Sequence, residues 1–481
     1  MAIRNNYEMT SGSEKAAAST EKGIVRRFLH LLSAQGAEAV SSTIFFLYLA
    51  WLDSSVYGEV MYAIAAGSVV MKVIQFGLYY PLVSDLGGAP SEKAPEILNR
   101  VNIVKLALLG PTLLTVIGII LYRGFSLQMG LVVFLTCLGF ALEALAETYF
   151  ADFRVRGLQR TEARIRMISS VASYGYGFVA ASLGMNPVLI SVFKLVSACV
   201  RIGFGLKNYF RLHAARLFVA TDWNTVWTVF RAALVFALIE ILGIIYNKTN
   251  IFFLEEATGV KGVAFYSATW NLVDPVSTLA SEQLLGWVVF PLLATLWWEN
   301  RSRVNTLVRS NARLLMAVAL PIMFFLHAES GMLIGLVYPA EYKDAVWMQQ
   351  YLVWTILLSF ENNLFAYVMM VAGAAKVLLS FAAVATVLNL IFNAVLVPSQ
   401  GLAGGCLVII LTKLVMTLLT FAYCQVRFRF FKAADFVLPV VMGAGGYCLF
   451  LILRPLITLH PAVAVTLALY SLVVWRFRSR F

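Results

Sequence analysis

The feature that most constrains the fold is a series of fourteen apolar segments, each long enough to cross a membrane as a helix. A helix needs about 20 apolar residues to span the roughly 30 Å hydrocarbon core of a bilayer. The predicted spans are 28–51, 55–84, 102–122, 129–153, 165–184, 187–206, 229–254, 262–296, 312–337, 345–372, 375–398, 401–425, 433–453 and 459–475. Only 13% of the residues are charged, against about a quarter in soluble proteins, so we predict an all-α, multi-pass membrane protein.

The lysines and arginines between the spans lie mostly on one side of the predicted membrane. The N-terminal tail, every second connection and the C-terminal tail carry 26 of them, counted with Arg166, Arg313 and Lys376 at the starts of the following spans, and the opposite side carries four. Because basic residues collect on the cytoplasmic side, both termini are predicted to be cytoplasmic. The net charge of +12 is then explained by topology, without nucleic-acid binding. Residues 1–27 lack the apolar core of a cleavable signal peptide, and we expect them to form a cytoplasmic tail.

A short pattern from the first part of the chain is repeated in the middle. The repeated residues are Val56, Gly58 and Tyr62, matched by Val260, Gly262 and Tyr266, and Tyr80-Pro81-Leu82, matched by Phe290-Pro291-Leu292. Repeated halves around a central site are common in transporters, so we predict two six-helix lobes that are related by pseudo-symmetry. The predicted domains are a cytoplasmic tail (1–27), an N-lobe (28–206), an inter-lobe linker (207–228), a C-lobe (229–425) and two C-terminal helices with a cytoplasmic tail (426–481). The linker is either an amphipathic surface helix or a solvated connection.

Several basic residues fall inside the predicted spans. A lysine at the centre of a spanning helix costs about 2.5–3.5 kcal/mol on insertion scales, so it normally faces a pore or a partner. The candidate cationic site consists of Lys72, Lys194, Lys248 and Lys413, with Arg201 and Arg231 nearer the cytoplasmic ends of their helices. Each buried lysine could instead belong to a structural ion pair, and the arginines could snorkel towards the interface. If the lysines face one cleft, we expect an anionic substrate.

The carboxylates within the spans suggest a second role. A buried carboxylate can carry protons through the membrane, and Glu38 and Glu240, in the first span of each lobe, are the candidates for coupling transport to a proton gradient. The chain has no glycine-rich loop ending in Gly-Lys-Ser or Gly-Lys-Thr and no nucleophile elbow. Its histidines and cysteines form no ligand pattern. We therefore expect a transporter with no enzymatic activity, no metal and no cofactor other than a coupling proton or sodium ion.

Motifs along the whole chain resemble the Wzx-type polysaccharide transporters, the lipid-linked oligosaccharide flippases of the MOP exporter superfamily. The first span contains Gln35-Gly36 and leads into Tyr57-Gly58, and the seventh contains the polar stretch Asn247 to Asn250 and leads into Gly262 to Tyr266. The later motifs are Leu333-Ile334-Gly335-Leu336-Val337-Tyr338, Glu341-Tyr342-Lys343-Asp344-Ala345, Gly373, Lys376, Asn389, Asn393, Val397-Pro398 and Gly401-Leu402-Ala403-Gly404-Gly405.

The resemblance implies a V-shaped two-lobe bundle that moves an undecaprenyl-linked oligosaccharide across the bacterial inner membrane by alternating access. It also implies contact with membrane lipid, and with a polysaccharide polymerase and a chain-length regulator as partners. Three alternatives remain: a cation-coupled multidrug exporter or a lipid II-type flippase of the same superfamily, and a membrane-embedded glycan polymerase or ligase. The short outer loops disfavour the last.

Overall fold

The computed structural model is almost entirely helical in the residues that it describes, which are 36–88, 90–213, 223–278, 285, 289–299 and 301–476. These residues divide into two compact units. Unit 1 contains the residues up to Leu52 and Ala63–Ile241, and unit 2 contains Asp53–Tyr62 and the residues from Leu242 onward. The predicted tails and residues 214–222 of the predicted linker lie outside the described residues, whereas residues 207–213 end a long helix.

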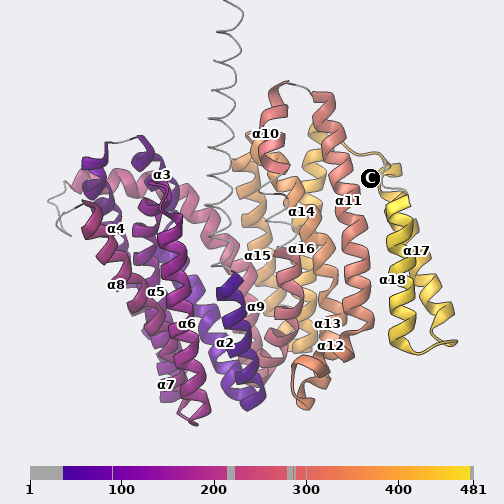
Figure 1. Cartoon of the computed structure of the whole chain (residues 1–481), viewed down its shortest axis with the longest axis horizontal. Helices are drawn as coiled ribbons and strands as arrows, with labels where there is room; N and C mark the ends of the chain where they lie inside the picture. Colours follow the sequence, from indigo (N-terminus) through magenta and orange to yellow (C-terminus); the bar gives the residue numbers. More distant parts are fainter. Residues whose placement is uncertain are drawn as a thin grey trace, which may run out of the picture. The chain divides into compact units, whose positions relative to one another are not determined.

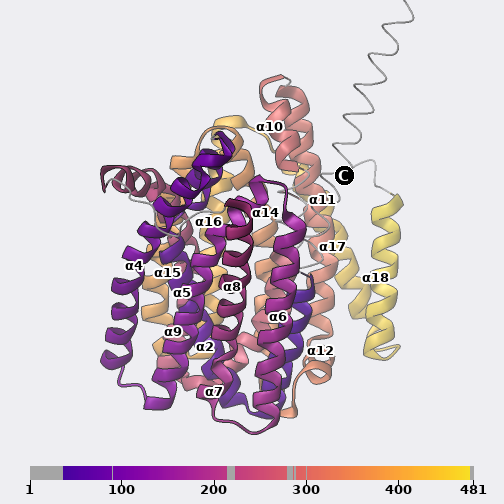
Figure 2. The ribbon, with the colours of Figure 1, turned by 60° about the vertical axis from the view of Figure 1, so that its left-hand side comes forward.

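Unit 1 is a bundle in which α5 is central, because it packs against α3, α4, α6, α7 and α8 (Figures 1 and 2). Its helices are Gly36–Leu52, α2 (Ser54–Gln75) from Ala63 onward, α3 (Tyr79–Gly88), α4 (Ala94–Tyr122), α5 (Leu127–Val155), α6 (Gln159–Ser182), α7 (Pro187–Ser191), α8 (Phe193–His213) and α9 (Trp223–Thr278) up to Ile241. A short 3-10 turn, η1 (Ser91–Lys93), precedes α4. Ser126 caps α5 by accepting a hydrogen bond from the Met129 backbone N–H, which satisfies one of the exposed donors at a helix start.

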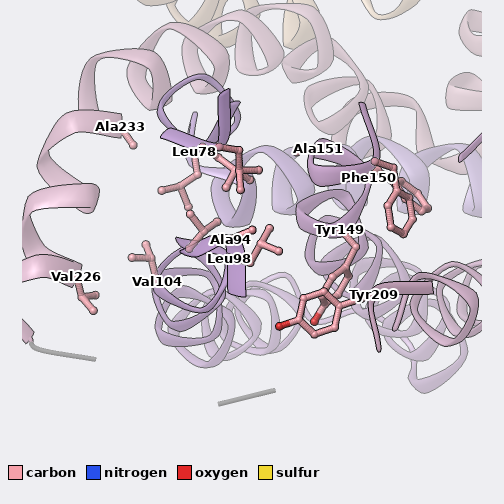
Figure 3. Close-up of a cluster of buried hydrophobic side chains, with 14 of the residues drawn as sticks. Leu78, Ala94, Leu98, Val104, Tyr149, Phe150, Ala151, Tyr209, Val226 and Ala233 are labelled. Carbon is pink, nitrogen blue, oxygen red and sulfur yellow. The ribbon is translucent and has the colours of Figure 1, made fainter. Parts of the chain in front are cut away.

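A buried apolar cluster at one end of unit 1 joins α3, α4, α5, α8 and α9 (Figure 3). Tyr149 of α5 and Tyr209 of α8 place their ring centroids 5.4 Å apart, while Leu98 and Phe150 are almost completely buried. Lipid tails are as apolar as these side chains, so the hydrophobic effect alone does not favour helix contacts over lipid contacts. Close packing of the rings and branched side chains therefore stabilises this end of the bundle.

Unit 2 contains α9 from Leu242 onward and the helices that follow it (Figure 1). These are α10 (Phe290–Glu299), α11 (Arg301–Ala328), α12 (Ser330–Val337), η3 (Ala340–Ala345), α13 (Val346–Leu352), α14 (Trp354–Val371), α15 (Ala375–Gln400), α16 (Leu402–Phe428), α17 (Ala433–Leu453) and α18 (Leu459–Arg476). Within α9, Gly259 has φ 69° and ψ −176°. A backbone with positive φ strongly favours glycine, so this residue divides α9 into two helical parts.

The predicted spans overlap these helices, but several of them cover two elements: span 55–84 covers α2 and most of α3, and span 312–337 covers the end of α11 and α12. Within the described residues, eleven helices are long and apolar enough to cross a membrane, and one of these is the divided α9. The helix Gly36–Leu52 and the more polar α6 occupy the positions of two further predicted spans. The prediction of an all-α membrane protein is confirmed, and the total of fourteen spans stays a prediction.

The first segments of the two copies, around Gly58 and Val260, touch each other inside unit 2. A Cβ atom added to Gly58 would lie 1.9 Å from the Val260 carbonyl oxygen, and Tyr62 packs edge-on against Phe252. The helix backbones can approach this closely only because position 58 has no side chain.

We expect Gly58→Ala to destabilise the protein by about 1–3 kcal/mol, as overpacking does, although alanine favours helix formation by about 1 kcal/mol. The measurement is the thermal unfolding midpoint of the purified protein in detergent. Gly445→Ala on α17 is the control, because a Cβ there would meet no atom within 4 Å. Equal midpoints for the two variants would contradict the close contact.

Candidate functional site

Two of the predicted lysines, Lys248 and Lys413, line one polar cavity of about 280 Å³ in unit 2. The cavity lies between α9, α14 and α16. Its other lining residues are Ile244, Tyr246, Asn247, Trp270, Asp274, Ser277, Leu358, Ser359, Asn362, Asn363 and Met416. With two ammonium groups and one carboxylate, the walls carry more positive than negative charge. Such a surface attracts anions, and the low dielectric of a membrane helix bundle strengthens the attraction.

Lys413 is held in place by two neighbours on the cavity wall. Its Nζ donates a hydrogen bond to the Ser359 hydroxyl at 2.7 Å and lies 5.1 Å from the centre of the Trp270 ring. The side chain is buried, yet no carboxylate of the described residues lies within ion-pair distance of Lys413 or of Lys248. Asp274 on the same wall acts electrostatically on both lysines without forming a close ion pair with either, so an anionic ligand could still pair with them.

Lys72 and Glu240 form an ion pair in unit 1, with 3.2 Å between Nζ and Oε2. They line a smaller cavity of about 190 Å³ together with Lys105, Glu147 and Arg154. Lys105 is buried and donates to the Ala144 carbonyl at 2.6 Å and to the Thr148 hydroxyl at 2.8 Å. The predicted proton carrier Glu240 is thus the direct counter-ion of one of the predicted site lysines.

Lys194 and Arg201 belong to a buried ionic network in unit 1. Glu143 on α5 accepts from Lys194 at 2.9 Å and from the Ser197 hydroxyl in a short hydrogen bond, and it lies 3.7 Å from Arg201. Arg201 also pairs with Glu38 at 2.7 Å. Both basic residues have carboxylate partners. For Lys194 this is the structural ion pair that was the alternative to substrate binding, whereas buried, ion-paired Arg201 does not match the predicted alternative of snorkelling. The predicted candidate Glu38 is part of the same network.

Arg231 lies apart from both cavities. It is exposed on α9, and its guanidinium lies 5.2 Å from the centre of the Trp227 ring. A tryptophan and an arginine one turn apart are typical of a helix face near the membrane interface. This arrangement agrees with the snorkelling alternative.

The polar lining of the cavity was not among the predicted site residues. Ser359, Asn362 and Asn363 are polar residues within the predicted span 345–372, and Trp270 and Asp274 lie four residues apart on α9. Polar residues are expensive in a spanning helix and mark functional positions. The spacing of 359, 362 and 363 on one helical face was therefore a usable signal.

An apolar groove of about 610 Å³ lies on the other side of α14. Leu357 faces the groove, whereas its neighbour Leu358 faces the cavity. The groove is formed by α11, α14, α17 and α18, with Met316, Leu320, Phe324, Tyr447 and Leu467 among its lining residues. Unit 2 thus places a polar, positively charged cavity and an apolar groove on opposite faces of one helix.

Comparisons with known proteins agree with this architecture. Residues 112–347 match the family described as "Polysaccharide biosynthesis protein". No curated protein gives a significant match to the sequence.

Three solved structures illustrate the shared fold. The lipid II flippase MurJ in an inward closed conformation has a TM-score of 0.66 at 11% identity, covering 93% of this chain and 98% of that one. A multidrug resistance MATE family transporter of the MOP superfamily in an inward-facing conformation has a TM-score of 0.62 at 16% identity, covering 82% and 94%. A MOP superfamily transporter from Pyrococcus furiosus, whose binding pocket is described as having reverse polarity, has a TM-score of 0.54 at 15% identity, covering 85% and 96%.

These matches confirm the superfamily fold that the sequence motifs predict, and the matched structures are transporters and a flippase. The chain therefore has the fold of the MOP superfamily transporters, and its residues 112–347 match a polysaccharide biosynthesis family.

Proposed function

We propose that this protein flips a polyprenyl-phosphate-linked oligosaccharide across the bacterial inner membrane by alternating access, for the assembly of a surface polysaccharide. The observation that carries the proposal is the cavity of unit 2, whose walls hold Lys248 and Lys413 with the single carboxylate Asp274, and no ion pair within 4.0 Å joins either lysine to a carboxylate of the described residues. A polysaccharide biosynthesis match over residues 112–347 supports the sugar part of the substrate.

The cavity suits the head of such a lipid. Lys248 and Lys413 would bind the phosphate oxygens through charge-assisted hydrogen bonds, which are stronger than neutral ones. Ser359, Asn362 and Asn363 offer hydroxyl and amide groups, and Trp270 offers an aromatic face, to the first sugar. At about 280 Å³ the cavity has room for a phosphate with part of one sugar, so the rest of the oligosaccharide would lie outside it.

The apolar groove suits the tail of the same lipid. Its lining is almost entirely hydrocarbon and aromatic, so a polyprenyl chain would replace contacts that it otherwise makes with lipid. Head and tail sites on opposite faces of α14 fit an amphiphile better than a small soluble anion.

Export of cationic drugs fits this cavity less well, because a cation would meet two ammonium groups and one carboxylate. A lipid II-type substrate has the same anionic head and polyprenyl tail and remains the second candidate, supported by the MurJ structural match. A polysaccharide polymerase and a chain-length regulator are the partners that the proposed pathway requires.

The test is transport by the purified protein in proteoliposomes. The probe is undecaprenyl diphosphate carrying N-acetylglucosamine, and its arrival in the other leaflet is read as accessibility to an added galactosyltransferase. We expect transfer to the probe to depend on the protein. Absence of flipping together with uptake of a cationic dye would overturn the proposal in favour of a drug exporter.

A further inference from the structure

Glu361 is a buried carboxyl group without a hydrogen-bond partner. It lies on α14 with 7% of its surface exposed, and both carboxyl oxygens lack a hydrogen bond within the described residues. It is four residues from Leu357, which lines the apolar groove, and three residues from Leu358, which lines the polar cavity, so it lies between these two faces of α14. Glu361 itself is not among the lining residues of the groove. Neither of the two polar cavities includes Glu361 in its lining.

The other deeply buried carboxylates of the described spanning helices behave differently. Glu143 pairs with Lys194, Glu162 pairs with Arg154 and Arg166, and Asp152 pairs with Arg156. A buried charge that remains ionised normally has such a partner, because taking it out of water costs several kcal/mol. Glu361 therefore differs from these buried carboxylates, because it has no basic partner within the described residues.

The basic groups of the helices packed against α14 do not supply the missing partner. Lys413 of α16 donates to Ser359, and His327 of α11 lies 3.2 Å from the Gln350 carbonyl oxygen. Arg309 and Arg313 of α11 lie 3.6 and 4.0 Å from Asp435. The remaining basic groups on the described parts of α15 and α16 include Lys376 and Arg427, which are exposed. Arg303 of α11 is also exposed. The other titratable groups on these elements and on α14 include Tyr351, Tyr367, Cys406, Tyr423 and Cys424, none of which carries a positive charge.

An isolated carboxyl group in apolar surroundings is stable as the neutral acid, because the charged form would lose its hydration without any compensation. We propose that Glu361 is a proton-binding site: it holds a proton in this conformation and releases it when a movement of α14 brings the carboxyl into contact with water. In that step the O–H bond breaks, its electron pair stays on the carboxylate, and the proton passes to water.

The position of Glu361 on α14 connects the proton to the transport cavity. Ser359, two residues before Glu361, and Asn362, the residue directly after it, line the cavity, and Ser359 accepts a hydrogen bond from Lys413. Because α14 is a rigid helix, a rotation that hydrates Glu361 also moves Ser359 away from or towards Lys413. The same movement of α14 would then release the proton and change the substrate cavity. Figure 1 shows α14 beside α16, the helix that carries Lys413. The coupling of proton release to transport rests on the proposed function, whereas the binding of a proton by Glu361 does not depend on it.

The bound proton is tested by infrared spectroscopy of the purified protein in lipid nanodiscs near neutral pH. Glu361→Gln is expected to remove one carbonyl stretching band of a protonated carboxylic acid. Glutamine has nearly the shape of the neutral acid, so the variant should fold, and Glu361→Leu provides a second variant without hydrogen-bonding groups. Glu240→Gln is the control and should leave that band unchanged, because Glu240 is ion-paired with Lys72. An unchanged acid band in Glu361→Gln would overturn the proposal.

The coupling is tested in the same proteoliposomes that test flipping. A gradient of one pH unit is worth about tenfold in a proton-coupled equilibrium, so wild-type flipping should respond by up to about tenfold and Glu361→Gln by less than about twofold. A variant that lost the acid band but kept the gradient response would refute the coupling. If even the wild-type protein did not flip the probe, the proposed function would fail, and the infrared result would still decide whether Glu361 holds a proton.

Discussion

Replacing both Lys248 and Lys413 by glutamine is expected to slow flipping of the undecaprenyl diphosphate probe by at least about a hundredfold. A hydrogen bond to a charged group contributes about 1.5–3 kcal/mol, and each 1.4 kcal/mol is tenfold in affinity. Both ammonium groups line the same cavity, so their losses should add when the phosphate binds between them. Initial flipping rates at low probe concentration measure the effect, and each single variant should lose about tenfold or more.

Two controls separate charge from geometry. Lys376→Gln removes an exposed lysine on α15 and should leave the rate unchanged. Ser359→Ala keeps both charges but removes the hydrogen bond that holds Lys413 at 2.7 Å, so it should cost less than the loss of Lys413 itself. Wild-type rates in the double lysine variant would show that the phosphate binds elsewhere.

The helices could be predicted from the sequence because membrane insertion depends on local composition. The span 375–398 is predicted almost to the residue, since α15 covers Ala375–Gln400. The less accurate boundaries are those where geometry depends on distant packing. The span 262–296 is one example: residues 262–278 continue α9 beyond Gly259, and a separate helix, α10, begins at Phe290.

The roles of the buried charges could be predicted only in part. Insertion cost identifies Lys194, Lys248 and Lys413 equally, but a partner distant in sequence decides what each one does. Lys194 meets Glu143, 51 residues away, whereas Lys413 meets Ser359, 54 residues away and uncharged. The first lysine is ion-paired with a carboxylate, whereas the hydrogen-bond partner of the second is a neutral hydroxyl. The sequence pattern does not distinguish the two lysines, because the partner of each one depends on which helices become neighbours in the folded protein.

The buried network around Glu143 predicts the largest effect on stability. Glu143→Ala should destabilise the protein by about 3–5 kcal/mol, the usual cost of removing one partner of a buried ion pair. The variant would leave Lys194 and Arg201, both at least nine-tenths buried, without their shared carboxylate, although Arg201 would keep Glu38. The thermal unfolding midpoint in detergent, or the yield of folded protein, measures the loss.

A second substitution distinguishes an unpaired charge from a simple packing defect. Adding Lys194→Met to Glu143→Met removes both charges, and replacing a whole buried pair by apolar side chains is often neutral or stabilising, so the double variant should recover most of the lost stability. Glu96→Ala is the matched control on α4, because the Glu96–Arg100 pair is partly exposed and such pairs contribute about 0–1 kcal/mol. If the double variant were as unstable as Glu143→Ala, the cost would come from lost packing and the hydrogen bond to Ser197, and the ionic network would not be what stabilises this part of unit 1.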